Sequence, residues 1–127
     1  MEAAYAFRVR FRLEPTDVSL EPSTFDTRAY LAAAEPGEDG WLLFRDVCWR
    51  GDVNDESYVC DLFTERLGVP VEAVSFAALH LDSAYRERLH AEIATQLDAF
   101  NAESVSAVIS KYLGSSVIVE DDGSVPG

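Results

Sequence analysis

Residues 4–13 alternate between large apolar side chains at odd positions and alanine or arginine at even positions. Such a period of two is typical of a β-strand with one face buried and the other facing solvent. The apolar face holds Tyr5, Phe7, Val9, Phe11 and Leu13. The opposite face holds Arg8, Arg10 and Arg12.

Residues 24–34 allow two interpretations. Phe25, Ala29 and Leu31 occupy alternate positions, which favours a strand, whereas the alanines at 32–34 are good helix formers. The turn-rich stretch 35–40 lies directly before the apolar run 41–44. A hairpin explains that order best, so we predict a strand over 24–34 that pairs with a second strand over 41–49, buried on both faces.

The middle of the chain predicts a helix followed by a strand. Asn54 is a good N-cap for a helix that ends at Leu67, before Gly68, with Val59, Leu62, Phe63 and Leu67 facing inward. Residues 71–81 read as a strand that carries on one face Val74, Phe76, Ala78 and His80, and on the other Ala73, Ser75, Ala77, Leu79 and Leu81.

The last third predicts two helices and a short strand. Asp82 or Ser83 caps a long helix whose apolar stripe runs from Tyr85 to Phe100 and which ends at Asn101. A helix over 105–113 and a strand over 116–119 follow. The expected fold class is therefore α+β, a single domain over residues 1–120 with an antiparallel or mixed sheet of about five strands and about three helices on one face. Residues 121–127 are expected to be an acidic flexible tail.

The net charge of the chain is more informative than its hydrophobic content. The 127 residues are 48% hydrophobic, which suits a packed core, but 23 acids oppose 10 basic residues and the net charge is −13. Nine of the ten basic residues are arginine, and the lysine is Lys111. This balance argues against nucleic acid and anionic membranes as partners. It is the composition expected of a cytoplasmic protein in a salt-accumulating microbe, where screening relieves the repulsion.

The densest polar segment is the predicted strand-to-helix junction at 45–55. It contains Arg45, Asp46, Trp49, Arg50, Asp52 and Asn54. Guanidinium forks hold carboxylate or phosphate bidentately, and an indole can stack on a ligand, so the junction is a candidate anion site. The other interpretation is internal, with the arginines paired to nearby acids, Asn54 acting as a cap and Trp49 in the core.

The stretch from Trp41 to Asp55 resembles the signature of the LWR-salt family, small proteins of halophilic archaea. The segment from Lys111 to Ser116 also resembles the closing segment of that family. Cys48 stands where the leucine of the Leu-Trp-Arg motif is expected, a small apolar replacement that affects packing more than function. The resemblance implies a salt-loving cytoplasmic source and implies no activity.

The arginine row of the first strand is the second candidate site. Its three cations are about 6.8 Å apart along one face, and they repel one another unless something negative faces them. The partner is either an external anion, such as an acidic partner segment or an RNA backbone, or internal, with Asp26, Asp46 or acids flanking Arg28 closing cross-strand pairs.

Catalytic templates are incomplete. His80 and His90 lack a serine or cysteine at motif spacing, and no glycine-rich phosphate loop is present. Cys48 and Cys60 lack metal-ligand spacing, so we expect reduced thiols, no metal and no cofactor.

These observations favour a non-catalytic binding module of a halophile cytosol that recognises an anionic ligand or acidic protein through its arginines. The competing interpretation is an enzyme acting on a phosphorylated or carboxylated small molecule, with Arg45 and Arg50 as clamps and Asp46 or Asp52 as general base. A third is self-association as a homo-oligomer.

Overall fold

The structure is a computed structural model that describes residues 1–13, 23–46, 48–49, 52–53, 56–121 and 125. In chain order, its elements are β1 (Ala3–Leu13), β2 (Ser23–Ala32), α1 (Leu43–Asp46), β3 (Cys48–Trp49), β4 (Asp52–Val53), α2 (Glu56–Leu67), β5 (Val71–Leu81), α3 (Ser83–Ala94), the 3-10 helix η1 (Leu97–Phe100), α4 (Val105–Tyr112) and β6 (Val117–Val119).

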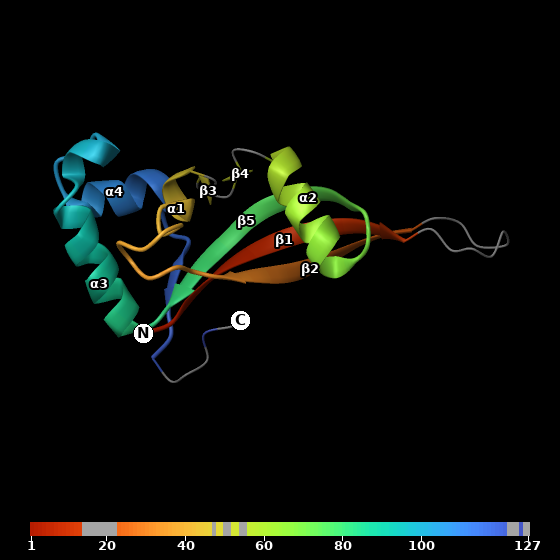
Figure 1. The fold of residues 1–127 in the computed structure, drawn as a ribbon, viewed down its shortest axis with the longest axis horizontal. Coiled ribbons are helices and arrows are strands. Elements are labelled where there is room, and N and C mark those ends of the chain that lie inside the picture. Colours follow the sequence, from red (N-terminus) through yellow and green to blue (C-terminus); the bar gives the residue numbers. More distant parts are fainter. Residues whose placement is uncertain (14–22, 47, 50–51, 54–55, 122–124, 126–127) are drawn as a thin grey trace, which may run out of the picture.

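A four-stranded sheet in the order β2-β1-β5-β6 forms the base of the fold (Figure 1). Strand β1 pairs antiparallel with β2 on one side and with β5 on the other, and β6 pairs in parallel with β5. The short strands β3 and β4 form a separate hairpin. The predicted α+β domain with a mixed sheet is confirmed, with one strand fewer in the main sheet and one helix more than expected.

The alternation of β1 is confirmed from Phe7 to Arg10, whereas residues 3–7 are all buried and Leu13 is exposed at the end of the strand. Tyr5, Phe7 and Val9 are buried, and Arg8 and Arg10 are exposed. The apolar face packs against the helices: the ring of Phe7 meets that of Phe63 from α2 edge-on, with centroids 5.5 Å apart. The opposite face, called the open face below, carries the arginine row.

The strand predicted over 24–34 is confirmed as β2, but its predicted partner is wrong. Strand β2 pairs with β1, with Tyr30 opposite Ala6 and Asp26 opposite Arg10. A turn-rich loop predicts a reversal of the chain and does not identify which strand lies alongside.

The strand predicted over 41–49 is also wrong. Residues 41–42 form a turn and 43–46 a single helical turn, and among the described residues of this stretch only Cys48 and Trp49 are extended. Trp41 and Phe44 are three residues apart, so one helical turn places both rings on the same side. There they join Phe100 and Tyr112 in an aromatic cluster with centroid distances of 5.9 to 6.3 Å. An unbroken apolar run has no period and therefore does not distinguish strand from helix.

Strand β5 has the predicted bounds, but its two faces were assigned wrongly at one end. The pairing with β1 shifts register between Ala6 and Phe7. A bulge of this kind reverses the side to which all later side chains point. Val74 and Phe76 therefore share the core face with Leu79 and Leu81. The open face of β5 holds Ala73, Ser75, Ala78 and His80.

Helices α2 and α4 agree with prediction, with two differences. Leu67, expected to face inward, is exposed at the end of α2. The predicted cap Asn54 lies outside the described residues. Ser104 caps α4 by accepting from the Ala107 N–H, and Gly114 follows that helix with a positive φ of 58°.

The long helix predicted from Asp82 to Phe100 is divided in two. Asp82 caps α3 as expected by accepting from the Tyr85 N–H, but α3 ends at Ala94 and η1 carries Leu97 and Phe100. Asn101 adopts the left-handed conformation, φ 50°, that ends the segment. No described helix has both the length and the hydropathy to cross a bilayer.

Candidate functional site

The arginine row lies on the open face of β1, as predicted, and two of its members face acids. Arg10 Nε lies 3.0 Å from Asp26 Oδ1, and a guanidinium nitrogen of Arg12 lies 4.0 Å from Glu72 Oε1. The hydrogen bond from Arg10 to Asp26 and the charge of that carboxylate raise the pKa of Arg10. Both groups are well exposed, 57% and 69%, so the pair contributes little to stability.

Arg8 has a different neighbour. Its position on β1 is directly opposite Arg28 on β2, so two arginines are cross-strand neighbours on the open face. In the described part of the chain, no acidic side chain forms a salt bridge with either of them. Like charges directly opposite each other destabilise a sheet. The arrangement therefore costs stability unless an outside anion joins it.

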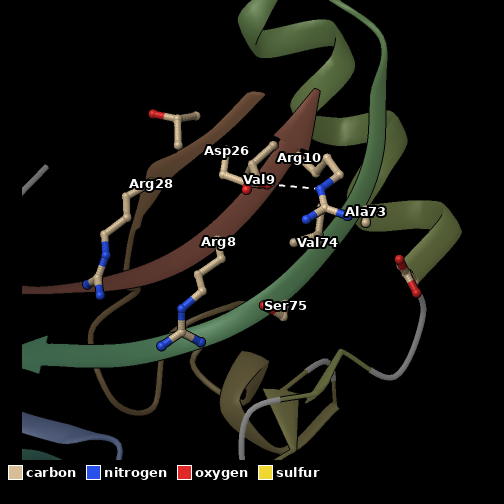
Figure 2. Close-up of a pocket in the computed structure, with 10 residues that line it drawn as sticks. Arg8, Val9, Arg10, Asp26, Arg28, Ala73, Val74 and Ser75 are labelled. Atoms are coloured by element: carbon tan, nitrogen blue, oxygen red, sulfur yellow. Dashed lines mark hydrogen bonds and ion pairs between the residues drawn. The ribbon is translucent and has the colours of Figure 1, made fainter. Parts of the chain in front are cut away.

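These two arginines line a shallow hollow of about 680 Å³. Figure 2 shows the side chains of Arg8 and Arg28 projecting from neighbouring strands, with the Arg10–Asp26 pair beside them. Ala73 and Ser75 form part of the wall, and Ser75 lies opposite Arg8 on β5. Small side chains there leave room above the sheet between the longer guanidinium arms.

The charge of the lining is opposite to that of the whole molecule. Three guanidiniums, of Arg8, Arg10 and Arg28, stand against the carboxylates of Asp26 and Glu56. Asp26 is already hydrogen-bonded to Arg10. The remaining positive groups are suited to a bidentate contact with a carboxylate or phosphate.

Arg28 was not among the predicted site residues. The alternation of 24–31 puts Arg28 and Asp26 on one face, and this signal was present in the sequence. The sequence did not show the register between β1 and β2, which places Asp26 opposite Arg10 and Arg28 opposite Arg8.

The second predicted site is only partly within the described residues. Arg45 contacts residues of its own chain: its Nε lies 2.8 Å from Asp46 Oδ1, and its guanidinium carbon lies 5.9 Å from the ring centroid of Phe100. Trp49 on β3 and Asp52 on β4 are paired positions in the two-stranded sheet. Arg50 and Asn54 lie outside the described residues. For Arg45, the internal interpretation of the junction agrees with these contacts.

The histidines and the described cysteine have structural surroundings. His80, only 8% exposed, lies with Nδ1 3.2 Å from Glu120 Oε1 and meets the ring of Tyr30. Burial, with a smaller contribution from Arg86, lowers the pKa of His90. Cys60 is a free thiol whose pKa is raised, mainly by burial. Across the described ranges, no group of three or more metal-ligating side chains comes together.

Comparison with known proteins agrees with the sequence resemblance. The model of the LWR-salt protein family matches residues 1–123. The chain belongs to the LWR-salt family. The matched segment includes the open face of this family member, with Arg8 and Arg28, and also the junction. No curated protein matches the chain, and no solved structure does.

Proposed function

We propose that this protein is a non-catalytic binding module that holds an anionic or acidic partner against the open face of its sheet. The observation that supports the proposal is the opposed pair Arg8 and Arg28, which lacks a described acidic partner in a chain of net charge −13. A carboxylate or phosphate group in the hollow would accept hydrogen bonds from both guanidiniums and relieve their repulsion.

The proposed setting is the cytosol of a halophile. In about 1 M salt the Debye length falls to about 3 Å, so general attraction between charged surfaces disappears there. Recognition then depends on direct contact between a guanidinium fork and the bound oxygen atoms. Arginine suits this task better than lysine because its donors have fixed planar geometry.

The test compares the double variant Arg8→Gln/Arg28→Gln with the parent. A fluorescein-labelled hexaglutamate peptide and inorganic pyrophosphate serve as probes, with fluorescence polarisation for the first and calorimetry for the second, in molar potassium chloride. Hydrogen bonds between charged groups contribute about 1.5–3 kcal/mol each. The double variant should therefore bind at least one of the two probes about tenfold or more weakly.

The matched control is Arg66→Gln/Arg86→Gln, which removes the same charge from exposed positions on α2 and α3, outside the hollow. This control should bind as the parent does. The melting temperature distinguishes a ligand-binding role of Arg8 and Arg28 from a structural role. For a binding role, removal of these opposed like charges should leave the melting temperature unchanged or raise it. A lower melting temperature with unchanged binding, or no probe binding by the parent, would overturn the proposal.

A further inference from the structure

Strand β2 is a ten-residue strand at the edge of the sheet. The Ala33 N–H donates to the Ala3 carbonyl at the end of the β1–β2 ladder. Because hydrogen-bonded positions alternate in an antiparallel pair, the odd-numbered residues of β2 direct their backbone groups toward β1. The even-numbered residues, from Thr24 to Tyr30, therefore present N–H and C=O groups on the outer edge, where they are available for another strand.

The outer edge of β2 is complementary to itself in charge. Asp26 and Arg28 are both outward-directed positions, and their side chains lie on the same open face. If β2 pairs antiparallel with β2 of a second copy about a two-fold axis at Thr27, Asp26 lies opposite the partner's Arg28, and Arg28 lies opposite the partner's Asp26. Opposite charges directly across an antiparallel pair are stabilising.

Other registers do not place Asp26 opposite the partner's Arg28. An even-numbered residue of β2, whose backbone groups point to the outer edge, must pair with an even-numbered residue of the partner strand. The two-fold axis must therefore pass through a residue of β2 and not between two residues. An axis at Asp26 or at Arg28 places two like charges opposite each other. An axis at Phe25 or Ala29 places no acid opposite Arg28. Among centres 25 to 29, only the Thr27 axis makes both ion pairs.

This register also buries apolar surface on the face of β2 opposite the open face. The side chain of Phe25 is 46% exposed, although it stacks on Phe11 at 5.7 Å. With the axis at Thr27, Phe25 lies opposite the partner's Ala29. The pairing thus removes apolar surface from water, a contribution that molar salt strengthens while it weakens long-range charge effects.

We propose that the protein forms a two-fold symmetric dimer in which the β2 strands of two copies pair antiparallel about Thr27. The two sheets then continue as one sheet of eight strands. An isologous contact of this kind closes on itself and leaves no second β2 edge for further growth. This inference does not depend on the proposed function.

The dimer would pair Arg28 with the partner's Asp26 and would still leave an excess of positive charge on the open face. Each cross-strand row on the open face would run from Arg10 through Asp26 to the partner's Arg28 and the partner's Arg8. Three guanidiniums per carboxylate remain, and two such rows lie side by side across the axis. The two hollows would then form one cationic strip.

Charge reversal tests the proposal. Asp26→Arg and Arg28→Asp are made separately, and mass is measured by sedimentation and light scattering in the lowest potassium chloride concentration at which circular dichroism shows the fold intact. The parent should be a dimer. Each variant alone faces like charges at both pairs and should dissociate at least tenfold more readily. An equimolar mixture restores both pairs and should return to the parent's dimer affinity.

Matched controls are Asp61→Arg and Arg66→Asp, which make the same charge changes at exposed positions on α2. Both should remain dimers. A parent that is monomeric at millimolar concentration would overturn the proposal. So would a mixture of the two reversed chains that stays monomeric, or a dimer that neither reversal weakens.

Covalent capture tests the register in molar salt, where charge effects are screened. In the proposed interface Thr27 faces its own copy at a non-hydrogen-bonded position, with Cα atoms about 4.5 Å apart, a distance that a disulfide spans. Oxidised Thr27→Cys should run as a cross-linked dimer. Phe25→Cys, whose counterpart is the partner's Ala29, and the parent with its free Cys60 should not. Cross-linking of Phe25→Cys in preference to Thr27→Cys would overturn the register.

Discussion

At the residue scale, the role of an exposed arginine depends on the residue opposite it across the ladder. Arg10 and Arg8 are two positions apart on the same face of β1, yet Arg10 faces Asp26 and Arg8 faces Arg28. The sequence marks both as exposed cations with equal clarity. Only the register distinguishes a guanidinium with an internal partner from one suited to an external partner.

Tyr85 leads to a prediction at this scale. Its buried hydroxyl donates to the Ala34 carbonyl at 2.6 Å, and burial, with a smaller contribution from Glu35, raises the pKa of Tyr85 to about 12. In the unfolded chain this phenol ionises at about pH 10. The contribution of this group to folding stability should therefore be constant below pH 10 and should fall as the pH rises from 10 to 12.

The variant Tyr85→Phe checks that prediction. At neutral pH the free energy of unfolding should fall by about 1–2 kcal/mol, because the Ala34 carbonyl loses its donor. Between pH 10 and 12 the variant should lose less stability than the parent, as measured by urea unfolding at each pH. Tyr58→Phe, at an exposed tyrosine, is the control. Equal alkaline losses in parent and Tyr85→Phe would contradict the assignment.

At the element scale, the first strand and the helix predicted over 105–113 agree with their sequence patterns, whereas the aperiodic run 41–44 and the periodic strand β5 do not. The apolar run 41–44 was not a strand, because packing of Trp41 and Phe44 with Phe100 and Tyr112 favours a helical turn. The bulge in β5 reversed the faces of Val74 and Phe76. Both outcomes depend on residues that are far away in sequence.

Helix α4 provides a test at this scale. Ser104 accepts a hydrogen bond of 3.1 Å from the Ala107 N–H, which would otherwise lack a partner in the first turn. Ser104→Ala should lower the free energy of unfolding by about 1 kcal/mol. Ser110→Ala, at an exposed position inside the same helix, should change it by about 0.5 kcal/mol or less. Denaturant unfolding of the two variants measures both values, and equal losses would contradict the capping role.

At the scale of the whole molecule, the residues that give the chain its negative charge are not those that form its core. The core brings together residues from β1, β2, β5 and the helices in one apolar cluster. The excess of acids lies outside that cluster. Asp82 and Asp121 have local roles: Asp82 accepts from the Tyr85 and Glu2 N–H groups, and Asp121 accepts from the Ser83 N–H and hydroxyl. The acidic tail remains a prediction beyond Asp121.

Net charge of −13 predicts salt-dependent stability. Repulsion between acids opposes the compact state in dilute buffer, and about 1 M potassium chloride screens it beyond about 3 Å. The melting temperature should rise by about 5 °C or more, equivalent to about 1 kcal/mol for a chain of this length. A thermal melt followed by circular dichroism from dilute buffer to molar salt measures this rise. A flat or falling series would contradict both the prediction and the proposed halophilic setting.

By itself the sequence determined the single α+β domain, the strand faces of β1, most helix ends and the scarcity of basic residues. These features depend on hydrophobic periodicity, helix caps and composition, which can be read from residues that are close together in the sequence. Only the tertiary structure decided that β2 lies beside β1, that β5 changes face at a bulge, and that Arg28 stands opposite Arg8. Strand order and register arise from contacts between distant segments, and no local pattern in either segment encodes its partner.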